Sequence, residues 1–231
     1  TDLSSGATVV ISQFYGARHR DDVRKAVHTS IALSIAGGAV IMVLGIAFAG
    51  LALRAMNTPE DIMGLSLVYM RIYFLGVIPS LIYNMGSGIL RAIGDSKRPL
   101  YYLIASCMTN IVLDLFFVVV LRMGVAGVAI ATSLSQVASA AMVLYALMKT
   151  DDMYKLYPRE IRFSPSILSA IIKIGLPAGL QSTMYSVSNL IIQASINSFG
   201  TDTIAAWTAY SKVDGMFWMI MSAYGVSVTT F

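Results

Sequence analysis

The stretch YLIASCMTNIVLDLFFVVVL, residues 102–121, decides the fold class of this 231-residue chain. It is as long as the run of about 20 apolar residues that an α-helix needs to cross the hydrocarbon core of a bilayer. Its one charged residue is Asp114. A carboxylate at that depth is costly unless it faces protein or water. The stretch therefore predicts a membrane-spanning helix whose buried carboxylate has a specific task.

The remaining sequence has the same apolar character. The chain is 57% hydrophobic and 12% charged, about half the charged fraction of a soluble domain. No period of two, typical of membrane β-barrels, is present. We predict an all-α polytopic membrane protein whose two longest spans bend at Pro79 and Pro177. About seven membrane segments are expected: Gly6–Tyr15, Ile31–Leu53, Ile62–Leu90, Leu100–Leu121, Val125–Leu147, Ile167–Phe199 and Ile204–Phe231.

Basic residues alternate from loop to loop. Residues 16–26, 91–99 and 149–166 are rich in Lys and Arg, whereas the intervening loops hold only Arg54 and Arg122. The positive-inside rule assigns the basic loops to the cytoplasm. We therefore interpret these residues as determinants of topology and expect no nucleic-acid partner. The expected location is the cytoplasmic membrane of a bacterium.

Several chemical classes are excluded by residue type. The single cysteine, Cys107, excludes an internal disulfide, and with His19 and His28 it forms no metal-ligand pattern. No hydrolase, metalloprotease or phosphate-loop motif is present, so we expect neither an enzyme nor a cofactor. The chain has no leader peptide or initiator Met and stops inside an apolar run, so we expect an internal piece of a longer transporter-like chain.

Polar residues recur at one depth in three spans. Tyr69, Asp114 and Thr132 each lie seven residues from the outer end of their span, at a helix rise of about 1.5 Å per residue. Asn110 lies one turn from Asp114, on the same helix face. One carboxylate with neutral oxygen donors suits Na⁺, with Asp114, Asn110 and Thr132 as metal ligands and Tyr69 beside them. Burial also favours protonation of a carboxyl group, so the sequence leaves Na⁺ and H⁺ open as coupling ions.

Structural interpretations compete with this site. Arg71, two residues beyond Tyr69, could neutralise Asp114 in an intramembrane ion pair. Asn110 and Thr132 could hydrogen-bond between helices, and Tyr69 could serve packing alone.

A second polar row marks the sixth span. Gln181, Tyr185 and Asn189 recur every four residues, followed by Gln193 and Asn197. We predict that the first three, with Gln136, line a cleft for a drug-sized molecule; interhelical hydrogen bonding is the alternative. For Lys212 and Asp214 on the last span, a local charge pair is the favoured interpretation over a place in the cleft.

Six motifs resemble the multidrug and toxic compound extrusion (MATE) family of transporters. In order and spacing they cover essentially the whole chain: ISQFYGA at 11–17, LRAIGDSKRPL at 90–100, NIVLD at 110–114, GVAGVAIAT at 124–132, IGLPAGLQS at 174–182 and INSFGTDTIAA at 196–206.

This resemblance implies part of a twelve-helix, two-lobe transporter. Residues 1–150 would form most of the first lobe, from the end of helix 2 to helix 6. Residues 151–165 would be a cytoplasmic linker, and residues 166–231 would form helices 7 and 8. The family's first-lobe cation site uses positions that match Asn110, Asp114, Thr132 and Tyr69, together with a first-helix Asp that would precede residue 1.

The same resemblance implies a function. We expect a monomeric antiporter in the lipid bilayer that exports amphipathic or cationic drugs in exchange for Na⁺ or H⁺. A flippase for lipid-linked oligosaccharide precursors, from the same superfamily, is the alternative. The chain departs from one branch of the family, which has a Glu on the seventh helix where Met184, Tyr185 and Ser186 stand.

Overall fold

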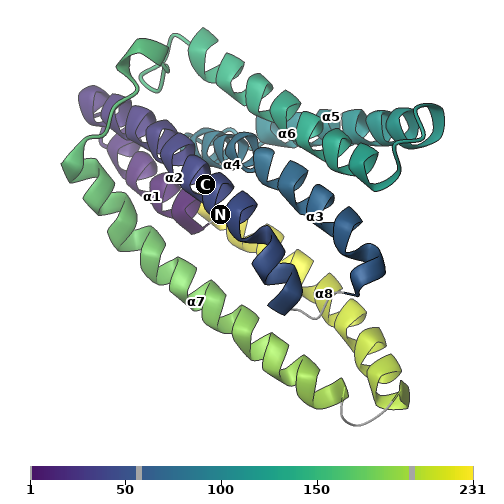
Figure 1. The fold of residues 1–231 in the computed structure, drawn as a ribbon. Helices are drawn as coiled ribbons and strands as arrows, with labels where there is room; N and C mark the ends of the chain where they lie inside the picture. Colours follow the sequence, from purple (N-terminus) through teal and green to yellow (C-terminus); the bar gives the residue numbers. More distant parts are fainter. Residues whose placement is uncertain (1, 56–58, 198–200, 231) are drawn as a thin grey trace.

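The computed structural model describes residues 2–55, 59–197 and 201–230, and within these ranges it contains helices and connecting segments but no strand (Figure 1). The apolar runs of the sequence become the helices, because a helix satisfies its own backbone hydrogen bonds where no water is available. The elements, in order, are α1 (Asp2–Gly16), α2 (Arg20–Ala55), α3 (Glu60–Leu75), α4 (Val77–Ala92), α5 (Lys97–Leu115), a π-helical turn (Phe116–Val120), α6 (Gly124–Lys149), a 3₁₀ turn (Pro158–Glu160), α7 (Pro165–Asn197) and α8 (Thr201–Thr230).

The seven predicted membrane segments coincide with helices of the described chain, and five of them are long and apolar enough to cross a membrane. In the described chain α2, α5 with its π-turn, α6 and α7 are each long and apolar enough to cross a membrane, and α3 with α4 forms a fifth, bent span. That span bends by 42° at Gly76, three residues before Pro79, as the sequence predicted. The second predicted bend point, Pro177, lies inside α7, which continues through it as one helix.

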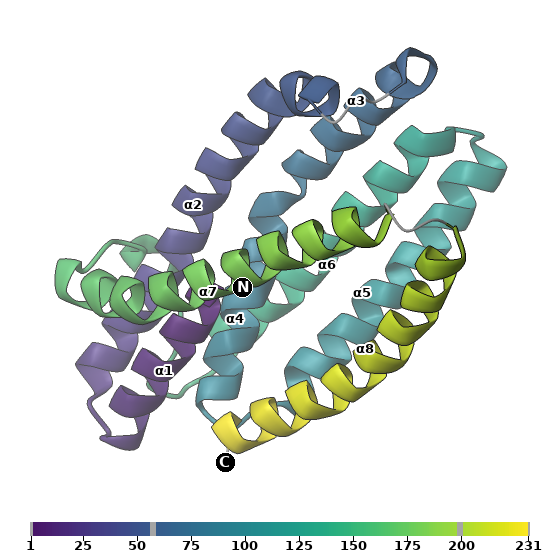
Figure 2. The same ribbon diagram turned by 90° about the horizontal axis from the view of Figure 1, so that it is seen from below.

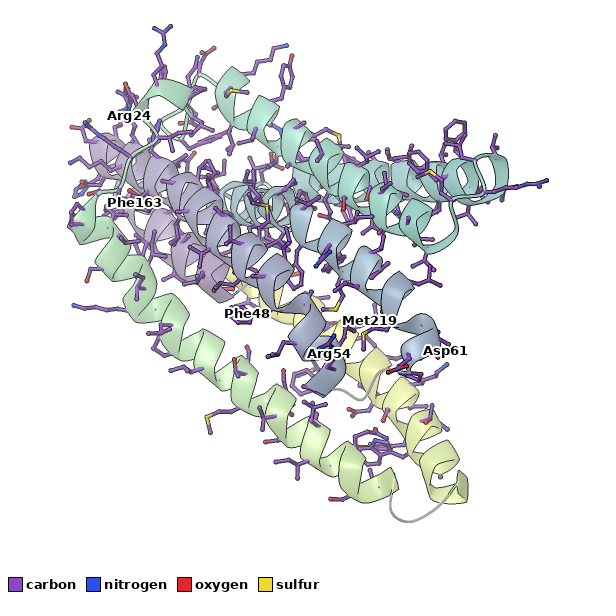
Figure 3. The ribbon with its side chains drawn as sticks, in the orientation of Figure 1. Arg24, Phe48, Arg54, Asp61, Phe163 and Met219 are labelled. Carbon is purple, nitrogen blue, oxygen red and sulfur yellow. The ribbon has the colours of Figure 1, made fainter. Side chains whose placement is uncertain are left out.

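The helices converge at the end of the bundle where residues 150–164 lie, here called the linker end. The linker folds back onto the helices: the Leu156 N–H donates to the Leu147 carbonyl at 2.9 Å. Tyr154 and Leu156 are buried in the main apolar cluster. Figure 3 shows Arg24 and Phe163 at the linker end, and Arg54 and Asp61 at the opposite end. The basic segments at 16–26 and 149–166 therefore share one end, as the alternation of charge predicted.

Contact between α1 and α7 closes the linker end. Ile167 and Ile171 of α7 are buried there, and Gly6 of α1 lies directly against the α7 backbone. Beyond Gly175 most of α7 is exposed, and it diverges from α2 together with α8 (Figures 1 and 2). The described helices thus form a bundle that is closed at the linker end and splayed at the other.

Large apolar side chains cover much of the outer surface. Phe48, Leu51 and Met219 are more than half exposed, and Figure 3 shows Phe48 and Met219 on the two splayed helices α2 and α8. In water this surface would drive aggregation, whereas in a bilayer it meets acyl chains at no cost. The chain is a multi-pass membrane protein.

Candidate functional site

The predicted carboxylate lies on the half-buried face of α5. Asp114 and Asn110 are one turn apart, and both are partly shielded from solvent. Among the described residues, the Asp114 Oδ1 and the Asn110 Nδ2 are buried atoms with no hydrogen-bond partner. Buried polar groups are nearly always satisfied, because leaving one unpaired costs about 1–3 kcal/mol and more for a charged group. Two such atoms on successive turns of one helix mark a place where a ligand would supply the missing interaction.

A change of helix type begins two residues after Asp114. Residues Phe116–Val120 form a π-turn, in which the Leu121 N–H donates to the Phe116 carbonyl at 3.0 Å. Short π-segments inside α-helices are rare and occur often at functional sites. The π-turn begins at Phe116, directly after Leu115, the last residue of α5. It is therefore close to the unpaired carboxylate of Asp114.

Helix α6 sets the depth of the other predicted ligands. The Ser106 hydroxyl of α5 donates to the Ser135 carbonyl of α6 at 2.7 Å. Because these helices are antiparallel, this bond places Asn110 level with Thr132 and Asp114 about one turn, roughly 5 Å, further from the linker end. The sequence predicted that Thr132 and Asp114 would share a depth. The register instead indicates two adjacent layers.

Tyr69 reaches the same region from α3, which also packs on α6. The Ser133 hydroxyl donates to the Ile72 carbonyl at 3.1 Å, which fixes the register of α3 on α6. Tyr69 lies one turn further from the linker end and stacks on Tyr73, with the ring centroids 6.1 Å apart. By this register Tyr69 lies closer in depth to Asn110 and Thr132 than to Asp114. The four predicted residues thus come from α3, α5 and α6, and hydrogen bonds join α6 to each of the other two helices.

A small cavity of about 100 Å³ lies where α3, α4 and α6 meet. Thr132 and Gln136 line it, opposite Tyr73 and the bend at Gly76. The Thr132 hydroxyl donates to the Val128 carbonyl at 2.9 Å, which leaves the lone pairs of its oxygen available as acceptors. Gln136, predicted for the substrate cleft, lines this smaller cavity.

The alternative of an intramembrane ion pair is absent from the structure. No ion pair joins Arg71 to Asp114 within the described residues, and Arg71 is exposed. The carboxylate is therefore not neutralised by the one cation that the sequence offered for it.

A larger cavity of about 860 Å³ lies between α7 and α8. It contains the three residues that the sequence predicted for a cleft on α7, namely Gln181, Tyr185 and Asn189. On the α8 side it is lined by Asp214 and by two tryptophans, Trp207 and Trp218. Tyr185 and Trp218 meet edge to face, with ring centroids 6.2 Å apart. Of the remaining polar row, Gln193 also lines this cavity, while the side chain of Asn197 lies outside the described residues.

Asp214 is the residue that sequence reasoning placed wrongly. The favoured interpretation paired it with Lys212, yet the ion pairs of the described chain include neither residue. Residues two apart point to different sides of a helix, and only Asp214 lines the cavity. The two-residue spacing of Lys212 and Asp214 is visible in the sequence and already disfavours an ion pair between them.

Comparison with known proteins assigns the chain to a protein family. The family model MatE matches residues 2–116, which include the α5 carboxylate. The chain belongs to the MatE family. It is 28% identical to the probable multidrug resistance protein YoeA of Bacillus subtilis strain 168, over 99% of this chain and 51% of that protein. It is 34% identical to the probable multidrug resistance protein YpnP of the same strain, over 86% of this chain and 43% of that protein.

The fold is shared with solved MATE transporters. One multidrug resistance MATE family transporter, solved in an outward-facing conformation, superposes with a TM-score of 0.88 at 25% identity, over 99% of this chain and 51% of that structure. The chain spans about half the length of the curated relatives it matches. Together these matches establish a MATE-type membrane fold, of which the described helices are a part.

Proposed function

We propose that the transporter to which this chain belongs exports amphipathic cationic molecules in exchange for Na⁺ or H⁺. The observation that carries the proposal is the unpaired carboxylate oxygen of Asp114, buried in a membrane-spanning helix beside the unpaired amide of Asn110. The carboxylate oxygen is costly when it has no partner, and it is satisfied by a cation or a proton. Asn110 would contribute to a cation site through its amide oxygen. Thr132 and Tyr69, which lie at similar depth on α6 and α3, would complete the oxygen donors around Na⁺.

The cavity between α7 and α8 supports the class of exported molecule. Its volume of about 860 Å³ falls in the range of drug-sized sites. It combines the Asp214 carboxylate with the rings of Tyr185 and Trp218, and these groups attract an organic cation by charge and by cation–π contact. Gln181 and Asn189 add hydrogen-bonding groups that can adapt to different ligands. The relatives YoeA and YpnP carry the name of multidrug resistance proteins.

The shape of the bundle supports an exchange mechanism. The helices are closed at the linker end, which the positive-inside rule places in the cytoplasm, and they splay at the other end. A ligand drives a conformational change only if it binds the two states with different affinity. We propose that the cation at Asp114 and the organic cation between α7 and α8 favour opposite states, so that entry of one expels the other. The lobes would be residues 1–150 and 166–231, joined by 151–165, within a monomer.

Transport by the protein at its natural length, in proteoliposomes, tests this function. A Na⁺ gradient and a pH gradient are imposed separately while efflux of a fluorescent organic cation is followed. The wild-type protein should respond to one of the two gradients, and Asp114→Asn should abolish that response without preventing membrane insertion. Asp61→Asn, which removes an exposed carboxylate at the start of α3, is the matched control. Normal gradient-driven efflux by Asp114→Asn would refute the role of Asp114.

The flippase alternative requires side chains of a different charge in the cavity between α7 and α8. A pyrophosphate-linked lipid needs cationic side chains, but the described lining between α7 and α8 carries the acidic Asp214 and no Lys, Arg or His. We therefore favour export of cations. Movement of a labelled lipid-linked oligosaccharide by the reconstituted protein would reverse this preference.

A further inference from the structure

A third cavity lies at the linker end, remote from both sites described above. Its volume is about 410 Å³, and its walls come from the first turns of α2, from the 3₁₀ turn and from the segment that follows this turn. Figure 3 shows Arg24 and Phe163 at this end of the bundle. The cavity is polar, and its lining is Asp21, Arg24, Lys25, His28, Thr29, Arg159, Glu160, Arg162 and Ser164.

Cations outnumber carboxylates in this lining. Four Lys or Arg side chains face two acids. The Arg24 guanidinium binds both oxygens of Glu160, so these two charges largely cancel. The described residues offer no ion-pair partner to Arg159 or Arg162. The planar guanidinium groups of Arg159 and Arg162, with their N–H donors, therefore remain available for an anion from outside the chain.

Hydrogen bonds from the buried residues His28 and Thr29 hold the cationic wall in place. The His28 Nδ1 lies 2.7 Å from the Arg24 carbonyl, while its Nε2 accepts the Tyr157 N–H at 3.0 Å. The first bond needs a proton on Nδ1 and the second needs a lone pair on Nε2, so together they define the Nδ1-protonated tautomer. One residue along, the Thr29 hydroxyl oxygen accepts the Ser164 N–H at 3.1 Å. The linker is thus tied to α2 on both sides of Arg159 and Arg162.

The depth of the cavity matches that of a lipid headgroup. Thr29 stands two residues before Ile31, where the apolar run of α2 begins, and Asp21 lies about two turns further out. At about 1.5 Å per residue the cavity extends outward from the edge of the hydrocarbon core. This is the layer where the phosphates of phospholipids lie and where the cytoplasmic surface attracts basic residues.

We propose that this linker-end cavity binds a phosphate group. Arg prefers phosphate because its fork matches two of the phosphate oxygens, and Lys25 adds a point charge. The same group is carried by anionic phospholipids and by soluble phosphates. An anion held there would join α2 to the linker between the two lobes. The proposal is independent of the exported molecule and of the coupling ion.

Binding by the purified protein at its natural length tests the cavity. The probes are phosphatidylglycerol added to phosphatidylcholine nanodiscs, and inorganic phosphate added in detergent. Bound lipid is counted by native mass spectrometry, and phosphate is followed by the rise in unfolding temperature. The Arg159→Gln/Arg162→Gln variant should bind at least about tenfold more weakly, since each lost charge-assisted hydrogen bond is strong. Arg18→Gln/Arg20→Gln removes two charges from the basic segment 16–26, at the same end of the bundle but outside the lining, and should bind normally.

The outcomes divide clearly. Selective loss with both probes supports a site for the phosphate group itself, and selective loss with phosphatidylglycerol alone supports a lipid site. Equal loss of binding in the two double variants would mean that general surface charge attracts the probe, and would overturn the proposal. Absence of binding by the wild-type protein would overturn it as well. Unfolding temperatures without added ligand show whether each variant is folded.

Discussion

The substitution Gly6→Ala tests the closed end of the bundle. A Cβ at residue 6 would lie 2.7 Å from the Ile171 carbonyl oxygen and 2.9 Å from the Gly175 nitrogen, both on the α7 backbone. Backbone atoms cannot rotate away as the end of a side chain can. Ordinary contact begins at 3.4 Å, so α1 and α7 would have to separate by several tenths of an ångström.

The cost follows from the behaviour of overpacked interiors. One methyl group forced into a tight contact costs about 1–3 kcal/mol, which corresponds to a shift of roughly 5–150-fold in a two-state equilibrium. The shift should favour whichever state separates α1 from α7 at the linker end. Gly16→Ala is the matched control, because a Cβ at residue 16 of the same helix meets no atom within 4 Å.

Cysteine labelling measures the separation. Ile171 is fully buried against α1, so Ile171→Cys, with the exposed Cys107 replaced by Ser, reacts with a polar maleimide only while the two helices are apart. Labelling should be roughly 5–150-fold faster in Gly6→Ala than in Gly16→Ala. Equal rates in the two variants would show that α1 and α7 do not form the closing contact.

Two further substitutions probe the register and the linker. Ser106→Ala removes the 2.7 Å bond that sets α5 on α6 and should cost about 1 kcal/mol, seen as a lower unfolding temperature than for Thr109→Ala, which removes only a bond within α5; an equal loss would argue against the register. At Glu160 the hydrogen bond from Arg24 lowers the carboxyl pKa below its ordinary value of 4.5, so its stabilising effect is complete above that pH and disappears as the pH falls through the lowered value. The difference in unfolding temperature between wild type and Glu160→Gln should therefore be constant near neutral pH and vanish in acid, and a difference that persists in acid would contradict this assignment.

The sequence predicted the helices well because lipid imposes strict requirements. Runs of apolar residues located most spans to within a few residues, although α2 begins at Arg20, eleven residues before the predicted start at Ile31. Pro79 indicated the 42° bend near Gly76. The positive-inside pattern identified the shared linker end. These predictions rest on local properties, namely side-chain hydrophobicity and backbone hydrogen bonding, which a bilayer leaves few ways to satisfy.

The sites were predicted less completely because they depend on how helices face one another. Counting residues along each span placed Asp114 and Thr132 in one layer, whereas the Ser106–Ser135 bond sets them about a turn apart. The place of Asp214 in the cavity between α7 and α8 depends on the angular position of α8. The linker-end cavity needs the return of residues 157–164 onto α2, a long-range contact that no local pattern encodes.

The π-turn that follows α5 forms the outer end of this span and has an angular phase of its own. A turn that holds one surplus residue rotates everything after it by about 100° relative to a continuous α-helix. The aromatic and valine side chains of Phe116–Val120 therefore take their orientation from the wide turn, while the carboxylate takes its own from the α6 contact. Gain or loss of a single residue within the wide turn would reorient the outer tip of this span and leave Asp114 in its place against α6.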